Sequence, residues 1–184
     1  MGGVRIATAD DAAAVAAVYA PYVTDTAISF EMVPPSADEM RARMAAVLPT
    51  YPWLVFEDES GVAAYAYASA HAERAAYRWS VDAAIYASAG AHRRGMGRAL
   101  YGRLFDLLAR QGFHAAYAGI ALPNARSVGL HEAMGFTHVG TFAEVGYKFG
   151  AWHDVGWWRR SLGQGAAPAE PIPFARLLAE APRR

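Results

Sequence analysis

The chain has 184 residues, of which 54% are hydrophobic, so it is long enough for one well-packed domain and too short to argue for two. Lysine and arginine together number 17, as do aspartate and glutamate, so no net charge favours binding to nucleic acid. The lack of cysteine excludes disulfides, thiolate zinc sites and a cysteine nucleophile.

The N-terminal segment predicts a strand followed by a helix. Residues 4–8 predict the strand, and Asp10 or Asp11 is suited to cap a helix whose apolar side chains recur at helical spacing up to residue 22. The same aspartates interrupt the apolar run of a signal peptide, and Ile6 stands where a myristoylation motif needs Ser or Thr. No apolar run approaches the roughly 18 residues of a membrane span. We therefore expect a cytoplasmic protein that does not bind membranes.

The next segment predicts a helix and then three strands. The prolines at 34 and 35 interrupt the chain before a helix expected at 37–48. Residues 53–70 predict two strands joined by a turn, and residues 79–86 predict another strand. Asp82 lies in the middle of this last strand, on the face that alternation gives to aromatic and small side chains.

The second half begins with an amphipathic helix. Leucines form an apolar stripe along residues 91–112, and Gly112 is suited to end this helix. After it we expect, in chain order, a strand at 114–122, a short helix at 124–134 closed by Gly135, and extended segments at 137–149 and 151–162.

This order of elements predicts an α/β (α+β) fold. We expect a mixed, mostly antiparallel central sheet with one parallel pair in its second half and helices on both faces. Residues 1–163 should form the single domain. Residues 164–184, rich in Pro, Gly and Ala, should form a loose tail with one helical turn near its end.

The start of the long helix carries a candidate phosphate site. Two glycines, Gly95 and Gly97, follow a predicted strand and open the helix, so free N–H groups and the positive end of the helix dipole meet there. Arg93, Arg94 and Arg98 supply positive charge around them. An ordinary helix start with solvated arginines is the alternative. Neither the P-loop motif nor the dinucleotide-binding motif fits this segment. We therefore expect a pyrophosphate-containing ligand other than those that these two motifs bind.

The segment "HRRGMGRALYGRL" resembles the pyrophosphate loop of the GCN5-related N-acetyltransferases, which bind acetyl-CoA. The resemblance covers roughly residues 4–162, and "GIALPNARSVGLHEAMGF" followed by "GYKFGAWHDVGWW" narrows it to the phosphinothricin acetyltransferase-like branch. It implies that Met96 and the residues around it in this loop bind the cofactor. The sequence departs from the family pattern at His92, usually Arg or Gln, and at Asp82, usually Glu.

The resemblance also implies the catalytic residues. Asp82 occupies the position of the general base. Since a carboxylate is a weak base for an ammonium proton, we expect a water to relay the proton. On the helix at 124–134, Asn124, Ser127 and His131 share one face. By resemblance Asn124 and Ser127 contact the cofactor, and His131 stands where many members have the Tyr that protonates the departing thiolate. A core or surface histidine is the alternative.

Other residues are candidates for the acetyl and acceptor sites. The backbone of Ile85, Tyr86 and Ala87, where the strand should stop pairing, suits the acetyl carbonyl and the pantetheine amide. By resemblance Arg74 holds an acceptor carboxylate or phosphinate. Weaker candidates, each equally suited to a structural role, are Phe30 and Tyr77 for a pocket wall and Lys148 for a second anionic contact.

No metal site is expected. His153 and Asp154 are adjacent in a predicted strand, so they point to opposite faces, and no third ligand lies at suitable spacing. We interpret them as structural, beside aromatic residues that pack the sheet or a subunit contact. The resemblance implies a homodimer.

The leading hypothesis is an acetyl-CoA-dependent N-acetyltransferase that acts on the α-amine of a small amino-acid-like acceptor of the phosphinothricin, methionine sulfoximine or methionine sulfone type. One alternative is the same reaction on another amine, such as a polyamine or a peptide N-terminus. Another is a non-catalytic sensor of acetyl-CoA, which the replacement of Glu by Asp82 keeps open.

Overall fold

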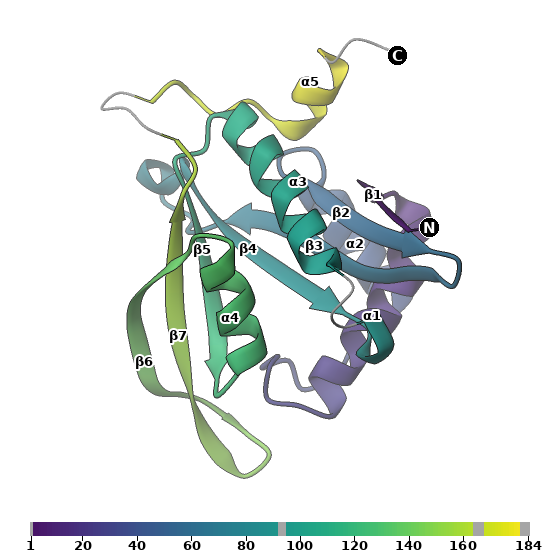
Figure 1. The fold of residues 1–184 in the computed structure, drawn as a ribbon, viewed down its shortest axis with the longest axis vertical. Helices are drawn as coiled ribbons and strands as arrows, with labels where there is room; N and C mark the ends of the chain where they lie inside the picture. Colours follow the sequence, from purple (N-terminus) through teal and green to yellow (C-terminus); the bar gives the residue numbers. More distant parts are fainter. Residues whose placement is uncertain (1, 92–94, 164–167, 181–184) are drawn as a thin grey trace.

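The computed structural model describes residues 2–91, 95–163 and 168–180, which form one seven-stranded sheet with helices on both faces (Figure 1). The strands are β1 (Gly3–Ile6), β2 (Trp53–Asp58), β3 (Gly61–Ala70), β4 (Ser80–Ala87), β5 (Ala115–Leu122), β6 (Thr137–Lys148) and β7 (Ala151–Ser161). The α-helices are α1 (Ala12–Thr24), α2 (Ala37–Val47), α3 (Met96–Gln111), α4 (Ala125–Ala133) and α5 (Phe174–Ala179). Short 3-10 turns are η1 (Ala9–Asp11), η2 (Ala75–Tyr77) and η3 (Ala89–Ala91).

The sheet has the order β1-β2-β3-β4-β5-β7-β6. All neighbouring strands run antiparallel except β4 and β5, which are parallel because α3 carries the chain back across the sheet. The predicted mixed sheet with one parallel pair is therefore confirmed. The parallel pairing is short: it joins Ser80–Asp82 to Ala115–Tyr117 and ends there. Beyond Asp82 the two strands separate.

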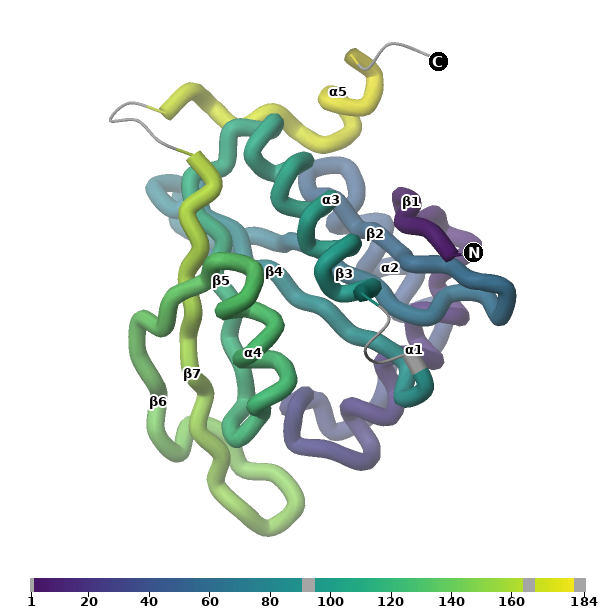
Figure 2. Tube along the Cα trace, in the orientation of Figure 1, coloured from purple at the N-terminus to yellow at the C-terminus, as the bar shows by residue number. Residues whose placement is uncertain are grey.

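Each face of the sheet carries its own core. Figures 1 and 2 show α3 and α4 over one face and α1 and α2 over the other. The predicted leucine stripe of α3 is confirmed, since its side chains are at most 1% exposed: Leu100, Leu104, Leu107 and Leu108. Gly112 ends this helix in the left-handed conformation that favours glycine. Among the described residues, no helix combines the length and the apolar character needed to cross a membrane.

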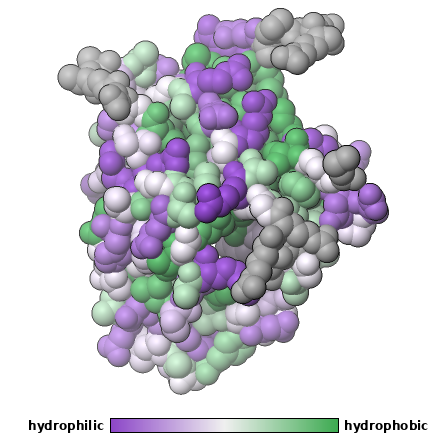
Figure 3. All heavy atoms as spheres, viewed as in Figure 1, coloured by the Kyte–Doolittle hydropathy of each residue, from purple (hydrophilic) through white to green (hydrophobic). Residues whose placement is uncertain are grey.

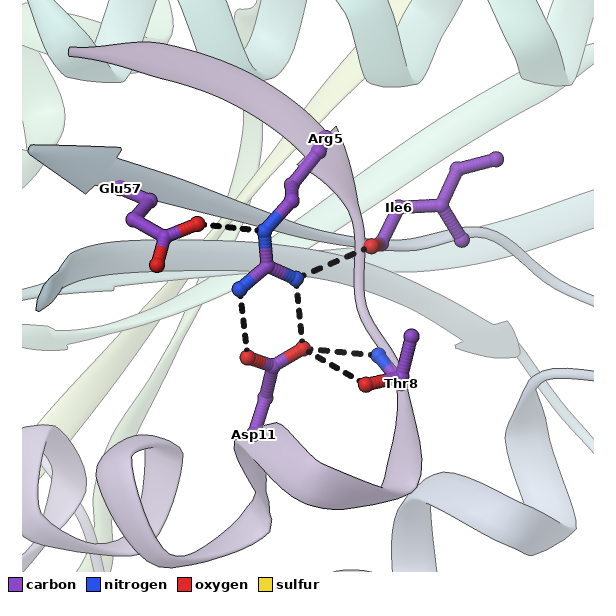
Figure 4. Close-up of polar contacts among 5 residues, drawn as sticks. All are labelled: Arg5, Ile6, Thr8, Asp11 and Glu57. Atoms are coloured by element: carbon purple, nitrogen blue, oxygen red, sulfur yellow. Dashed lines mark hydrogen bonds and ion pairs between the residues drawn. The ribbon is translucent and has the colours of Figure 1, made fainter.

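The start of α1 is fixed by an ion-pair network. Asp11 lies at the predicted helix start, but its carboxylate makes no side-chain cap to the helix. It accepts two hydrogen bonds from the Arg5 guanidinium, both 2.7 Å, and one from the Thr8 N–H, as Figure 4 shows. Glu57 on β2 accepts a further bond from Arg5. The Arg5 guanidinium holds the pKa of Asp11 below its ordinary value. Its hydrogen bonds to Asp11 connect β1 to the start of the first helix.

The described part of the C-terminal segment is docked, whereas its composition predicts a loose tail. Phe174 of α5 is 1% exposed and belongs to the core beneath α3. The Gln111 side-chain amide donates to the carbonyl oxygen of Ile172, and the Trp79 indole N–H donates to that of Ala169. Figure 2 shows this segment against the C-terminal end of α3. The composition is rich in Pro and Ala, so it does not reveal that Phe174 and Leu177, one helical turn apart, are buried in the core.

Candidate active site

A groove of about 1230 Å³ opens where β4 and β5 separate. Its walls are α1 and the loop after it, the end of β4, the start of α3 and the start of α4. Figure 3 shows a hollow at this place on the face that carries α3 and α4. Typical small-molecule pockets measure about 300–1,000 Å³, so this groove has room for an elongated ligand of nucleotide size or larger.

The backbone at the end of β4 faces this groove. Residues in alternate positions of a strand direct their N–H and C=O groups to the same side. Because β4 has no partner beyond Asp82 on the β5 side, the N–H and C=O of Ile85 on that side face the groove without a strand partner. Ala87 differs from the expectation, since the Tyr22 hydroxyl donates to its carbonyl at 2.5 Å and accepts from its N–H. Tyr86 lines the groove with its side chain.

The first turn of α3 presents to the groove N–H groups that have no hydrogen-bond acceptor among the residues that the structure describes. Gly95 is the N-cap and has φ +75°, a left-handed conformation that L side chains rarely adopt. The first backbone bond of the helix runs from the Ala99 N–H to the Gly95 carbonyl, so the N–H groups of Met96, Gly97 and Arg98 precede the hydrogen-bonded ladder. All of these residues line the groove except Ala99. This helix start is a suitable anion site.

Two cations in the groove lining complement these donors. Arg98, expected from the sequence, lies there, and Arg126 on α4 joins it. Arg126 was not among the predicted residues, because its position beside α3 depends on the packing of two helices. The predicted Arg93 and Arg94, with His92, lie outside the described residues.

Gly97 allows close packing of α3 against its neighbours. A Cβ atom built on Gly97 would lie 3.0 Å from Cδ2 of Leu130 on α4 and 3.7 Å from Cδ1 of Ile85 on β4. Gly97 also lines the groove, so its predicted role in clearing space for a pyrophosphate stays a prediction. This glycine lets α3, α4 and β4 approach one another and so sets the width of the groove.

The start of α4 forms the facing wall. Asn124 is the N-cap, and its side-chain oxygen accepts a hydrogen bond of 3.1 Å from the Ser127 N–H. Both residues line the groove, and their contact with a cofactor stays a prediction.

His131 lies in the core instead of the groove. It is 3% exposed, and its Nδ1 donates to the Ser127 carbonyl at 2.7 Å while its Nε2 accepts from the Tyr101 hydroxyl at 2.8 Å. Burial lowers the pKa of the imidazole, which favours the neutral form. Both ring nitrogens are occupied, so this geometry does not support the predicted transfer of a proton to the thiolate. The prediction that Asn124, Ser127 and His131 share one helix face was correct, but at His131 this face packs against α3.

Asp82 stands at the point where the strands separate, and it has a partner that the sequence did not reveal. Its Oδ1 lies 2.6 Å from Nδ1 of His71, in the loop after β3. Burial raises the pKa of the Asp82 carboxyl, and the hydrogen bond from His71 partly opposes that rise. The signal for this pair is the strand register: Ser69 is opposite Asp82, so His71, two residues further, falls on the same face.

Aromatic rings surround this pair. The His71 ring stacks on Tyr117 at 4.4 Å, and Tyr77 and Trp157 approach it edge-on at 6.0 Å each. The predicted Tyr77 is thus beside the pair, and Arg74 is exposed in the same loop as the N-cap of η2. The His71–Asp82 pair thus forms a polar site with an aromatic rim at the point where β4 and β5 separate.

Lys148 and Phe30, two other predicted substrate contacts, are not among the residues that line the groove. Lys148 is 3% exposed and donates to the carbonyl oxygens of Val23, Ser29 and Glu31 at 2.6, 2.7 and 2.9 Å. Its donors are fully used, so the anionic contact expected of Lys148 is replaced by a structural one. Phe30 packs against Gly146, where a Cβ atom would lie 2.1 Å from its ring, and is 38% exposed.

The pair His153 and Asp154 makes structural contacts. His153 bonds to the Lys148 carbonyl at 3.0 Å, and Asp154 accepts from the Glu144 N–H at 2.8 Å. In the part of the chain that the structure describes, no three His, Cys, Asp or Glu side chains gather as a metal site.

Comparison with known proteins accounts for this arrangement. The model of the Acetyltransferase (GNAT) domain matches residues 4–157. The chain belongs to the GCN5-related N-acetyltransferase family. As a member, it is an acetyl-CoA-dependent N-acetyltransferase, and the groove with free N–H groups at its helix start fits the pyrophosphate and pantetheine of that cosubstrate.

Similar proteins show to which branch of the family this acetyltransferase belongs. A phosphinothricin N-acetyltransferase of Streptomyces viridochromogenes is 40% identical over 174 residues, 95% of either chain. An L-methionine sulfoximine/L-methionine sulfone acetyltransferase of Salmonella typhimurium is 34% identical over 90% of this chain and 97% of its own. The crystal structure of a phosphinothricin acetyltransferase from Sinorhizobium meliloti in complex with acetyl-CoA superposes with a TM-score of 0.88, at 35% identity over 93% of this chain and 95% of its own. The predicted family and branch are confirmed.

Proposed function

We propose that this acetyltransferase transfers the acetyl group of acetyl-CoA to the α-amine of a small amino-acid-like acceptor of the phosphinothricin, methionine sulfoximine or methionine sulfone type. The names of the relatives support this acceptor class. The observation that carries the proposal is the position of the Asp82–His71 pair: Asp82 lies where β4 and β5 separate, three residues before Ile85, which lines the groove together with the start of α3.

The residues around the groove have distinct roles in this proposal. The N–H groups at the start of α3, together with Arg98 and Arg126, hold the pyrophosphate. The backbone of Ile85 bonds to the pantetheine arm, and Asn124 and Ser127 form the opposite wall. The acetyl donor is already activated as a thioester, so holding it against the acceptor supplies much of the rate enhancement.

Arg74 is the proposed ligand of the acceptor's carboxylate or phosphinate. Among the described residues its guanidinium has no hydrogen-bond or ion-pair partner, so its donors are free. A bidentate contact of this kind contributes about 1.5–3 kcal/mol, which corresponds to a preference of roughly 10- to 150-fold.

Free-thiol release from acetyl-CoA by the purified protein tests the proposal. The panel comprises phosphinothricin, methionine sulfone, common amino acids, polyamines and short peptides. We expect kcat/KM for the first two to exceed that for polyamines by at least about tenfold. Preferred turnover of polyamines or peptides would overturn the acceptor class. If the protein binds acetyl-CoA but releases free thiol with no acceptor of the panel, a sensor of acetyl-CoA would be favoured instead.

The remaining expectations stay predictions. A homodimer and a cytoplasmic location, without binding to nucleic acid or membranes, follow from the sequence and the resemblance. The exposed apolar side chains of the β6–β7 hairpin, among them Phe142, Tyr147 and Trp152 at 58–60% exposure, are the candidate contact between subunits.

A further inference from the structure

The pair formed by His71 and Asp82 has the geometry of a proton-transfer unit. The Asp82 carboxylate, 2.6 Å away, accepts a hydrogen bond from Nδ1–H of His71, which leaves the lone pair of the neutral ring on Nε2. Nε2 has no hydrogen-bond partner among residues 2–91, 95–163 and 168–180. The imidazole is 25% exposed and the carboxylate 34%, so both are sheltered but reachable.

The pair lies at the point where β4 and β5 separate. Asp82 is opposite Tyr117 in the last pair of the parallel ladder, and the His71 ring stacks on Tyr117. Ile85, where the groove lining begins on β4, is three residues further along the strand, roughly 10 Å at about 3.3 Å per residue. A ligand that extends along β4 from the start of α3 toward the N-terminal end of the strand therefore extends toward this pair.

We infer that His71, oriented by Asp82, is the group that accepts the proton from the acceptor's ammonium. This inference rests on the proposed function, because it names the base for the same reaction. Asp82 is then a positioning residue: it fixes the tautomer and the ring orientation, and it stabilises the imidazolium that forms.

The reaction balances with His71 in this role. The acceptor ammonium donates one proton to Nε2, and the freed lone pair of nitrogen forms a bond to the thioester carbonyl carbon. The C–S bond breaks, and the coenzyme leaves as the thiolate. The second proton lost by nitrogen goes to the thiolate, and His71 returns its proton to solvent.

The geometry favours His71 over the two groups that the sequence indicated. Asp82 has one carboxylate oxygen occupied by His71, and a carboxylate is a weaker base than imidazole. His131 has both ring nitrogens bonded within the core. An imidazole with a free nitrogen is the side chain best matched to proton transfer near neutral pH.

The variant His71→Asn tests the inference, because the amide of Asn can still donate to Asp82 at the place of Nδ1 but has no basic nitrogen at that of Nε2. We expect kcat to fall about 10²- to 10⁴-fold, with the Kd of acetyl-CoA unchanged. His138→Asn is the matched control, since His138 is exposed on β6 and bonds to Thr141. It should keep full activity.

The pH profile gives a readout that a structural role would not change. The group that accepts the proton shapes the dependence of kcat/KM on pH, so His71→Asn should change this profile while His138→Asn leaves it unchanged. The groups that face His71 are Asp82 from β4, Tyr117 from β5 and Tyr77 from η2; Arg159 of β7 is opposite Tyr117.

A second readout needs no turnover. A long-range ¹H–¹⁵N spectrum of the free protein should show His71 as the Nδ1–H tautomer, and Asp82→Asn should change it. The double variant His71→Asn with Asp82→Asn should lose about as much activity as the worse single variant, because the two residues act as one unit.

The outcomes separate this inference from the proposed function. If the native protein acetylates phosphinothricin and His71→Asn keeps its kcat within a few-fold with an unchanged pH profile, the inference is wrong and the function stands. If the native protein acetylates nothing on the panel while the spectrum still shows the Nδ1–H tautomer, the proposed function fails and takes the catalytic role of His71 with it.

Discussion

Lys148 shows how a single residue can be assigned to the wrong role by its type alone. As the only lysine of the sequence, close to a family motif, it was a candidate anion ligand. In the structure its ammonium instead joins the end of β6 to three carbonyls at the end of α1 and in the loop after it. That loop carries the groove residues Thr26 and Ile28. The residue therefore supports the groove wall without touching an acceptor.

Replacing Lys148 by Met, which has a similar volume, should lower the free energy of unfolding by about 3 kcal/mol. Three hydrogen bonds to a charged group contribute about 1.5–3 kcal/mol each, and part of this sum is offset because the ammonium no longer has to be desolvated. Urea unfolding measures the change, with Arg103→Met on the exposed face of α3 as the control. A loss no larger than that of the control would show that the three bonds contribute nothing.

At the scale of elements, the site depends on how closely α3, α4 and β4 approach one another. Gly97 is at the contact of all three, with Leu130 and Ile85 as its nearest side chains. Gly102 lies one and a half turns further along α3, and a Cβ atom there would meet no atom within 4 Å. The same substitution at Gly97 and at Gly102 therefore distinguishes an effect on helix packing from an effect on helix propensity.

Gly97→Val should raise the Kd of acetyl-CoA at least about tenfold, or about 1.4 kcal/mol, because the new side chain pushes α4 away from α3 and distorts both groove walls. Isothermal titration calorimetry measures the affinity. Gly102→Val introduces the same side chain at a position where its Cβ atom contacts no other atom, so it should leave the Kd unchanged. Equal Kd values for the two variants would refute the packing role of Gly97.

The elements themselves could be predicted from the sequence, and their contacts only in part. Period-two and period-3.6 patterns located the strands and helices within a few residues, as the leucines of α3 and the stop at Gly112 illustrate. The pair of His71 with Asp82 could not be predicted, because it depends on the register between β3 and β4. For His131 the helix face was known but not the element against which that face packs.

At the scale of the whole molecule, the C-terminal segment closes the core that supports the active site. Phe174 and Leu177 of α5 belong to the same core as α3, and the Gln111 amide at the end of α3 is bonded to carbonyls of Thr50 and Ile172. The segment therefore stabilises the helix whose other end presents N–H groups to the groove.

Phe174→Ala should destabilise the protein by about 3–5 kcal/mol, since it removes a fully buried ring and leaves a cavity. Leu178→Ala, on the same helix but 39% exposed, should cost less than about 1.5 kcal/mol. Thermal denaturation of both variants gives the comparison. Similar melting temperatures for the two would mean that α5 is not part of the cooperative unit.

The most direct test of the account follows the acetyl group itself. Acetyl-CoA labelled with ¹³C at the acetyl carbonyl is mixed with phosphinothricin and the purified protein, and ¹³C NMR follows the carbonyl signal. We predict that the thioester signal disappears while an amide signal of N-acetylphosphinothricin grows at the same rate, and that no signal changes without protein. A thioester signal that persists, or that is converted only to free acetate, would contradict acetyl transfer to an amino-acid amine.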